Sequence, residues 1–286
     1  MPADTGPPPV PAPTPQPAFP IRAAFYYPWF PEAWNQQGIN PFTKYHPTLG
    51  FYASGEDAVR MSHLQSLEYA KFEAGIYSWW GQGHYTDQRF GGMLGATNAR
   101  HSPIKWAAYH EREGTTDPTA DAIGADLDYI KSKYAGDPSY LKVAGKPVIF
   151  VYAGGADACP MADRWVQANT AERDFYVVLK VFAGYRSCTS PPQSWHQYAP
   201  SSRTDRQNGY SFAISPEFDL TGSEPERLPR DLAAFQQAAV NMVASNEPWQ
   251  LVISFNEWGE NTATESADEW ASSSGHGQYL DVLAGP

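Results

Sequence analysis

Two glutamates three residues apart follow an apolar run near the end of the chain. Residues 251–260 read LVISFNEWGE, so the run leads into Glu257 and Glu260 with Trp258 between them. Cleavage of a glycosidic bond usually requires two carboxyl groups beside the scissile bond, one of which must hold a proton. Burial among aromatic rings raises the pKa of a carboxyl group and lets it keep that proton. We therefore predict that Glu257 and Glu260 form a catalytic pair.

A sharp turn between the two acids could direct both into one cleft. Gly259 precedes Glu260 and gives the chain the freedom to turn there. The alternative interpretation is that Glu257 enters the interior of a barrel while Glu260 is a solvated loop residue. A metal-dependent reaction has less support, because the sequence contains neither an HExxH nor a CxxC motif. We expect neither a metal nor a cofactor at this site.

The composition favours a carbohydrate ligand over a nucleic acid. Aromatic residues make up 14% of the 286 residues, with 10 Trp and 17 Tyr, and aromatic faces stack on sugar rings as well as on bases. The net charge of −11 and the lack of a run of Lys and Arg argue against binding to a phosphate backbone. We therefore expect an oligosaccharide or polysaccharide partner. No stretch approaches about 18 apolar residues, so no membrane span is expected.

The first 20 residues differ in composition from the rest of the chain. Residues 1–20 are rich in proline and lack both the basic start and the apolar stretch of a signal peptide. This composition predicts a disordered, extended linker. Linkers of this kind often follow a signal peptide, so we expect a secreted or extracellular protein from which that peptide has been removed. We also expect a monomer.

Short apolar runs alternate with helical patterns along residues 21–286. The runs predict strands at 22–30, 74–80, 103–111, 146–154, 174–184, 195–200, 210–218 and 249–258. Helices are expected from residue 56 up to the second strand, and at 119–135, 162–172, 230–245 and 277–285. This alternation predicts an α/β fold, a single (β/α)8 TIM barrel of parallel strands. A doubly wound open sheet is the alternative, but no Gly-rich fingerprint opens the first helix.

Aromatic and polar residues gather at the ends of the predicted strands, where a barrel of this kind places its binding site. A single Tyr or Trp at a strand end is more often packed in the core than bound to a ligand. Because several predicted strands end in aromatic or polar residues, a shared binding cleft is the better interpretation. The predicted substrate-binding residues are Tyr27, Trp29, Trp79, Trp80, Glu111, Tyr152, His196, Asn256 and Trp258.

Several sequence blocks resemble glycoside hydrolase family 99, the endo-α-mannosidase group, and its bacterial relatives. SFNEWGE with TATES after it resembles the signature near the end of that family, and AFYYPWF, HPTLGFY, AGIYSWWG and KPVIFVY resemble earlier blocks in the same order. The resemblance implies a (β/α)8 barrel that cleaves α-mannosidic links with retention. It also implies that Glu257 acts as a base on the 2-hydroxyl of the sugar and that Glu260 is the general acid/base. The blocks further imply sugar contacts for Tyr27, Trp80, Glu111 and Tyr152.

The chain departs from this family at two positions of the last block. Asn261 stands where the family usually has Gly, and Asn also tolerates a left-handed backbone. Thr264 stands where an apolar residue is typical, and the chain is shorter than a typical endo-mannosidase. The resemblance favours mannan as the substrate, and the departures bear on mannose specificity more than on the class of α-glycan hydrolase. The alternatives are a hydrolase of a different α-glycan and a non-catalytic carbohydrate-binding or polysaccharide-assembly barrel.

Two cysteines complete the set of residues with possible chemistry. Cys159 follows the fourth predicted strand and Cys188 follows the fifth. Adjacent parallel strands place both cysteines at the same end of a barrel, so a disulfide between two loops is plausible. Two buried thiols are the alternative.

Overall fold

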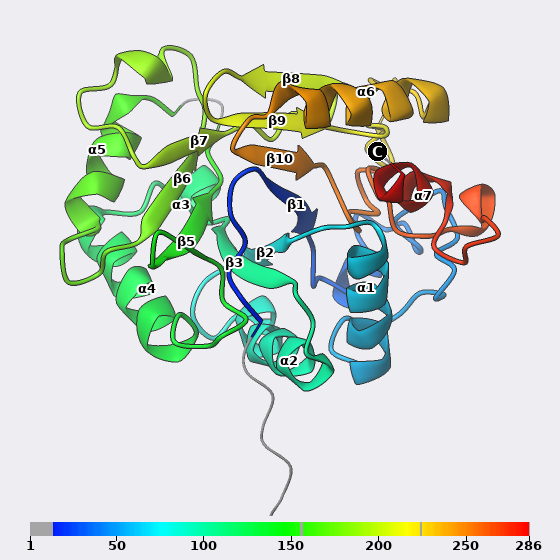
Figure 1. Ribbon diagram of the computed structural model, residues 1–286, viewed down its shortest axis with the longest axis horizontal. Coiled ribbons are helices and arrows are strands. Elements are labelled where there is room, and N and C mark those ends of the chain that lie inside the picture. Colours follow the sequence, from blue (N-terminus) through cyan, green and yellow to red (C-terminus); the bar gives the residue numbers. More distant parts are fainter. Residues whose placement is uncertain (1–13, 155–156, 224, 286) are drawn as a thin grey trace, which may run out of the picture.

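A curved sheet that nearly closes into a barrel forms the centre of the molecule (Figure 1). The computed structural model describes residues 14–154, 157–223 and 225–285. The parallel strands are β1 (Ile21–Tyr26), β2 (Ala74–Trp79), β3 (Lys105–His110), β5 (Lys146–Val151), β6 (Tyr176–Lys180), β7 (Ser194–His196), β9 (Ser211–Ile214) and β10 (Trp249–Val252). Two antiparallel strands, β4 (Lys142–Val143) and β8 (Thr204–Gln207), pair with β5 and β9.

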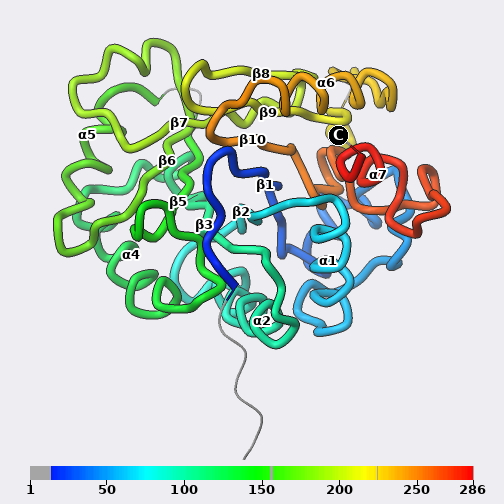
Figure 2. The backbone as a smooth tube through the Cα atoms, in the orientation of Figure 1, coloured from blue at the N-terminus to red at the C-terminus, as the bar shows by residue number. Residues whose placement is uncertain are grey.

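The order of the strands around the barrel is β7-β6-β5-β3-β2-β1-β10-β9-β8. Figure 2 shows that the first strand, in blue, lies beside the last strand, in orange, and Ile21 pairs with Trp249 in parallel register. Within the described residues no strand ladder joins β7 to β9, although the two strands lie close together. The expected barrel is therefore confirmed in its nearly closed form.

Helices surround the sheet on its outer side (Figure 1). They are α1 (Asp57–Tyr69), α2 (Tyr85–Arg100), the short α3 (Glu113–Thr116), α4 (Ala120–Lys133), α5 (Cys159–Ala168), α6 (Leu232–Ser245) and α7 (Gln278–Ala284). Short 3-10 turns occur at Glu32–Trp34, Tyr185–Ser187 and Asp268–Trp270. Helix α6 illustrates the packing, because Phe235, Ala238, Ala239 and Met242 are buried at the three- and four-residue spacing of one helical face.

The predicted list of elements lacked one helix and one strand that the structure contains. Helix α2 was not predicted, although Phe90, Met93, Leu94 and Thr97 are buried on one face. Its glycines and polar residues weaken the helical pattern of the segment. After β6 the chain forms a 3-10 turn, where no helix was predicted, and after β7 it forms the antiparallel strand β8, which was not predicted.

The core has two layers, one inside the barrel and one between the sheet and the helices. Alternate residues of β1 show both layers, because Phe25 packs inside the barrel while Tyr26 packs on the outer side. Strands covered on both faces explain the continuous apolar runs in the sequence. In β2, Gly75 is required by this packing, since a Cβ atom there would lie 2.2 Å from the ring of Trp106. No helix in the described ranges is both long and apolar enough to cross a membrane.

Part of the predicted N-terminal linker is packed against the barrel. Thr14 donates a hydrogen bond to the carbonyl of Ser102 (3.1 Å), and Gln16 donates one to the carbonyl of Tyr140 (3.0 Å). The buried ammonium group of Lys105 donates to the carbonyl of Thr14 (2.8 Å). The prediction of disorder is therefore wrong for residues 14–20. The rest of the predicted linker, residues 1–13, lies outside the described residues.

The two cysteines form a disulfide. Cys159 at the start of α5 is bonded to Cys188, which lies between β6 and β7, and their Cα atoms are 5.3 Å apart. Both positions follow the carboxyl ends of neighbouring strands, as expected. The bond encloses a sequence separation of 29 residues, and a cross-link of this span restricts the unfolded chain.

Removal of this disulfide is expected to lower the free energy of unfolding. We expect the double variant Cys159→Ser and Cys188→Ser to lose about 2–4 kcal/mol, because the unfolded chain regains the entropy of an open loop. Denaturant unfolding followed by tryptophan fluorescence measures this loss, with the wild-type protein in reductant as a second comparison. Equal midpoints for the variant and the oxidised wild type would contradict the expectation.

Candidate active site

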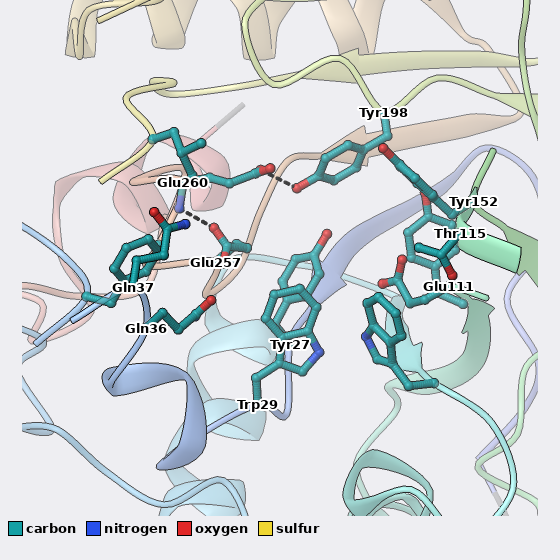
Figure 3. A pocket seen from close by; sticks show the side chains of 15 residues that line it. Tyr27, Trp29, Gln36, Gln37, Glu111, Thr115, Tyr152, Tyr198, Glu257 and Glu260 are labelled. Atoms are coloured by element: carbon teal, nitrogen blue, oxygen red, sulfur yellow. Dashed lines mark hydrogen bonds between the residues drawn. The ribbon is translucent and has the colours of Figure 1, made fainter. Parts of the chain in front are cut away.

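A cavity of about 280 Å³ lies at the carboxyl ends of the strands (Figure 3). This is the end at which proteins with this architecture place their active sites. The residues that line it are Tyr27, Trp29, Gln36, Gln37, Phe42, Trp80, Tyr109, Glu111, Thr115, Tyr152, Tyr198, Leu220, Glu257, Gly259 and Glu260. The wall therefore combines aromatic rings with three carboxyl groups.

Glu257 and Glu260 lie on a buried turn that follows β10. The strand ends at Val252, earlier than predicted, and the chain then folds back on itself. The backbone N–H of Ser254 donates to the carbonyl of Thr262 (3.0 Å), and the N–H of Thr262 donates to the carbonyl of Glu257 (3.2 Å). The hydroxyl groups of Ser254 and Thr262 are also hydrogen bonded to each other (2.9 Å). The turn thus fixes the direction of the segment that carries both acids.

The two carboxyl groups face the same cavity, one deeper than the other. Glu257 is only 4% exposed, while Glu260 is partly exposed to the cavity. The backbone N–H of Glu260 donates a hydrogen bond to the carboxylate of Glu257, and the hydroxyl of Tyr198 donates to Glu260 Oε2 (2.7 Å) (Figure 3). The interpretation of Glu260 as an isolated solvated loop residue is therefore wrong.

The protonation of the pair is set by burial and by mutual repulsion. Burial raises the pKa of Glu257 well above that of an ordinary carboxyl group, and the charge of Glu260 raises it further. Burial also raises the pKa of Glu260 to about 7, although the hydrogen bond from Tyr198 and the charge of Arg227 lower it. Two neighbouring buried carboxylates repel each other, which favours one shared proton, and the larger rise in pKa places that proton on Glu257 in the empty cavity. One acid and one base are thereby available together.

Asn261 adopts the left-handed backbone conformation that the sequence suggested. Its φ is 56°, a region that Asn enters more easily than most residues. Its side-chain amide group donates to the hydroxyl of Thr221 (3.1 Å) and to the carbonyl of Asp219, while its oxygen accepts from the hydroxyl of Thr43 (3.1 Å). Asn261 therefore fastens the turn to the segments that follow β1 and β9.

A third acid, Glu111, lies across the cavity from the pair (Figure 3). It is 7% exposed, and its Oε1 has no hydrogen-bond partner among the described residues. Burial raises the pKa of Glu111 to about 8, against a hydrogen bond from Ser78, and the charge of Glu260 raises it further. A buried, unpaired carboxyl oxygen that faces a cavity is suited to a polar group of a ligand.

Seven of the predicted site residues line this cavity. They are the two acids Glu257 and Glu260 together with Tyr27, Trp29, Trp80, Glu111 and Tyr152. Tyr109 and Tyr198 also line it; both stand at the ends of predicted strands but were not among the predicted substrate-binding residues. The signal for Tyr198 was its position two residues after His196, since alternate residues of an extended strand share a face. The other lining residues show no comparable pattern: Gln36, Gln37, Phe42 and Leu220 lie in loops, and Thr115 lies in the short helix α3.

Four predicted substrate-binding residues are buried behind the cavity wall and do not line it, which corrects that part of the prediction. Trp79 points outward from the barrel and donates from Nε1 to Asp87 (2.9 Å). The indole N–H of Trp258 lies 3.2 Å from the hydroxyl of Tyr52, away from the cavity.

The other two of these residues support the wall from within. His196 lies inside the barrel with Nε2 3.3 Å from the hydroxyl of Tyr109, and burial together with the charge of Lys180 lowers its pKa to about 3. A neutral imidazole therefore supports Tyr109. Asn256 accepts from the backbone N–H of Tyr27 (2.8 Å) and donates to its carbonyl (2.9 Å). Asn256 thus positions Tyr27, which does line the cavity.

Two groups of acids outside the cavity have spacing that could suit a metal ion. They are Glu113, Asp117 and Asp157, and Glu217, Asp219 and Glu226. Each group already holds a cationic side chain, because Arg164 contacts Asp117 at 3.0 Å and Lys44 contacts Glu217 at 2.7 Å and Asp219 at 2.6 Å. These carboxylates are therefore explained by ion pairs within the protein.

Comparison with known proteins identifies the fold. No protein-family model and no curated protein sequence matches the chain. Among solved structures, it is similar to the family 99 endo-alpha-mannosidase from Bacteroides thetaiotaomicron in complex with BIS-TRIS-propane, with a TM-score of 0.76, 16% identity, and coverage of 93% of this chain and 96% of that one.

A second structure of the endo-alpha-mannosidase from Bacteroides thetaiotaomicron gives a TM-score of 0.74 at 15% identity, again with 93% of this chain and 96% of that chain covered. A glycoside hydrolase-like protein gives 0.66 at 15% identity over 98% of this chain and 96% of that one. The chain therefore shares the barrel fold of the family 99 glycoside hydrolases.

Proposed function

We propose that the protein is a retaining glycoside hydrolase that cleaves an α-linked glycan in the manner of an endo-α-mannosidase. One observation carries this proposal: Glu257 and Glu260 lie on a single buried turn and face one aromatic-lined cavity. The shared fold with family 99 enzymes supports it. The resemblance of the SFNEWGE block assigns a role to each acid.

The first step requires the proton of the pair on Glu260, whereas burial favours it on Glu257 in the empty cavity, so the bound sugar must shift that proton to Glu260. The carboxylate of Glu257 then removes the proton of the 2-hydroxyl group. That oxygen attacks the anomeric carbon within the same sugar, while Glu260 donates its proton to the departing glycosidic oxygen. The bond from the anomeric carbon to the leaving sugar breaks as the bond to O2 forms. The difference in depth supports these roles, because the more exposed Glu260 can reach a leaving group and, later, a water molecule.

In the second step, Glu260 is a carboxylate and accepts a proton from water. The resulting oxygen nucleophile attacks the anomeric carbon and opens the anhydro ring, and Glu257 returns its proton to O2. Two inversions at one carbon give net retention. A pair of carboxyl groups that shares one proton is suited to this exchange, because each step needs one protonated and one ionised member.

The cavity wall suits an uncharged sugar. Among the described residues that line it there is no Lys or Arg, and Tyr27, Trp29 and Tyr152 offer aromatic surface. Aromatic faces pack on the apolar face of a sugar ring, while the free oxygen of Glu111 can pair with a hydroxyl group. Mannose is the sugar that the sequence resemblance favours. We also propose secretion, because disulfides persist mainly in oxidising compartments.

Loss of either acid is expected to abolish turnover. Glu260→Gln and Glu257→Gln should each lower kcat by about 10³-fold or more, because each removes a proton transfer that the reaction requires. Reducing-end release from a panel of α-linked polysaccharides, beginning with α-mannan, measures this loss, and NMR of the first product tests for retention. Glu56→Gln, which alters an exposed carboxyl group, is the matched control and should stay fully active.

Two results would count against the proposal. Full activity of Glu260→Gln on the substrate of the wild-type protein would remove the acid/base assignment. Binding of a glycan by the wild-type protein with no cleavage on long incubation would favour the alternative of a carbohydrate-binding barrel.

The pH dependence of kcat/KM is expected to be bell-shaped. At high pH the pair of glutamates loses its last proton and lacks an acid, and at low pH it holds two protons and lacks a base. The value of kcat/KM therefore falls on both sides of the pH optimum. The hydrogen bond from Tyr198 lowers the pKa of Glu260, so Tyr198→Phe should raise that pKa and move the alkaline limb to higher pH. Tyr210→Phe, which directly precedes β9 and does not line the cavity, serves as the control. An unchanged limb, or a move to lower pH, would show that the limb does not report Glu260.

A further inference from the structure

A buried carboxyl group that the proposed reaction does not use lies behind the turn that carries the two acids. We call this turn, residues 254–262, the catalytic turn. Glu265 is 3% exposed and does not line the active cavity. Its backbone N–H donates to the carbonyl of Phe255 (2.8 Å), which places it beside the start of the catalytic turn. A carboxyl group withdrawn from water is costly unless donors surround it.

Three donors from three parts of the chain meet at the Glu265 carboxyl group. The hydroxyl of Tyr52 donates to Oε2 (2.7 Å), and Nε1 of Trp258 lies 3.2 Å from the same oxygen. Nε2 of His63, a residue of α1, lies 3.0 Å from Oε1. All four side chains are buried. The carboxyl group therefore joins α1 and the loop before it to the catalytic turn.

His63 is itself held in one orientation. Its Nδ1 lies 2.9 Å from the hydroxyl of Tyr26, which packs on the outer side of β1. The imidazole also packs edge-on against the rings of Tyr52 and Phe255, with centroids 5.0 and 5.1 Å away. A carboxylate can only accept a hydrogen bond, so the proton of the contact with Glu265 lies on Nε2. His63 is thus a fixed donor to that carboxylate.

Glu265 reaches both chain neighbours of Glu257. It pairs directly with the indole N–H of Trp258. It also pairs with the hydroxyl of Tyr52, which in turn accepts from Nδ2 of Asn256 (3.2 Å). Glu257 stands between Asn256 and Trp258 in the chain, so its backbone is held on both sides. This restricts the direction in which its carboxyl group enters the cavity.

The far end of the catalytic turn has a support of its own. Arg230 donates from Nη2 to the carbonyl of Asn261 (2.7 Å) and to the carbonyl of Ala263 (3.1 Å). Loss of the Glu265 carboxylate would therefore loosen the part of the turn around Glu257 and leave the later part in place.

We propose that Glu265 is a positioning residue, which holds Asn256 and Trp258 so that the carboxyl group of Glu257 stays deep in the active cavity. This inference rests on the proposed function, because it assigns a support to the acid that would act as the base. Burial is the largest cause of the raised pKa of Glu257, so loss of the support should lower that pKa toward its ordinary value. A residue that only stabilised the fold would leave the titration of Glu257 unchanged.

The test measures this titration directly and requires no turnover. Carbon NMR of protein labelled at the glutamate carboxyl carbons follows Glu257, whose signal is assigned by its absence in Glu257→Gln. Glu265→Gln keeps the size of the side chain but replaces one accepting oxygen with an NH2 donor. We expect the midpoint of Glu257 to fall by about one pH unit or more, because water reaches its carboxyl group. The other titratable and charged groups around the pair are not altered by this substitution; they are Tyr27, Tyr109, Glu111, Tyr198 and Arg227.

Glu247→Gln is the matched control. Glu247 is also a buried carboxyl group, 5% exposed, and it accepts from Nε of Arg206 (2.7 Å) and from the backbone N–H of Gly209 (2.7 Å). It lies before the amino end of β10, away from the catalytic turn. This variant should lose stability and leave the midpoint of Glu257 where it is in the wild-type protein.

A second variant decides the matter if Glu265→Gln does not fold. Tyr52→Phe removes one donor to Glu265 and the link to Asn256, and it should lower the midpoint of Glu257 in the same direction. The proposal is overturned if the midpoint stays in place in the folded variant, or if Glu247→Gln moves it equally.

Kinetics provide a further readout in the active enzyme. Glu265→Gln should lower kcat about tenfold or more, because a small misplacement of a reacting group slows a reaction strongly. An unchanged kcat in the fully folded variant would also overturn the proposal. A wild-type protein that cleaves no α-linked glycan would contradict the proposed function, whereas the titration would still decide the role of Glu265.

Discussion

The site depends on the cost of withdrawing two carboxyl groups from water within one short turn. Glu257 is almost completely buried, and the turn supplies its compensation through the backbone N–H of Glu260. Ser254 and Thr262 close the same turn with backbone and hydroxyl hydrogen bonds. Buried polar groups are tolerated only when they are paired, so this arrangement leaves the acids few alternative positions. The shared proton is a consequence of that confinement.

The turn acts on the rest of the cleft through side chains that have no contact with the cavity. Asn256 pairs with both backbone groups of Tyr27 and so joins the end of β10 to the end of β1. Asn261 holds the segments that follow β1 and β9. The residues of the cavity wall that would bind a sugar and the two glutamates that would cleave its glycosidic bond therefore belong to one hydrogen-bonded unit. A barrel favours this design, because its first and last strands are neighbours.

The elements that the sequence predicted well are those whose pattern is local. The apolar run of β5, the start of β10 and the face of α6 follow from burial on both sides of a strand or on one side of a helix. The segment of α2 contains glycine and polar residues, so its pattern was too weak to recognise. Strand β8, which was also not predicted, depends on pairing with β9, and no local pattern records that pairing.

By itself, the sequence determined the candidate pair Glu257 and Glu260, the aromatic and acidic character of the ligand site, and the alternation that specifies a barrel. Only the tertiary structure decided which of two adjacent tryptophans reaches the cavity: Trp80 does, while Trp79 is buried on the outer side. It also joined Tyr198 and Glu111 to the pair, from strands distant in the chain. The physical reason is that residue type and spacing are local properties, whereas depth and direction depend on how the strands curve and what packs behind them.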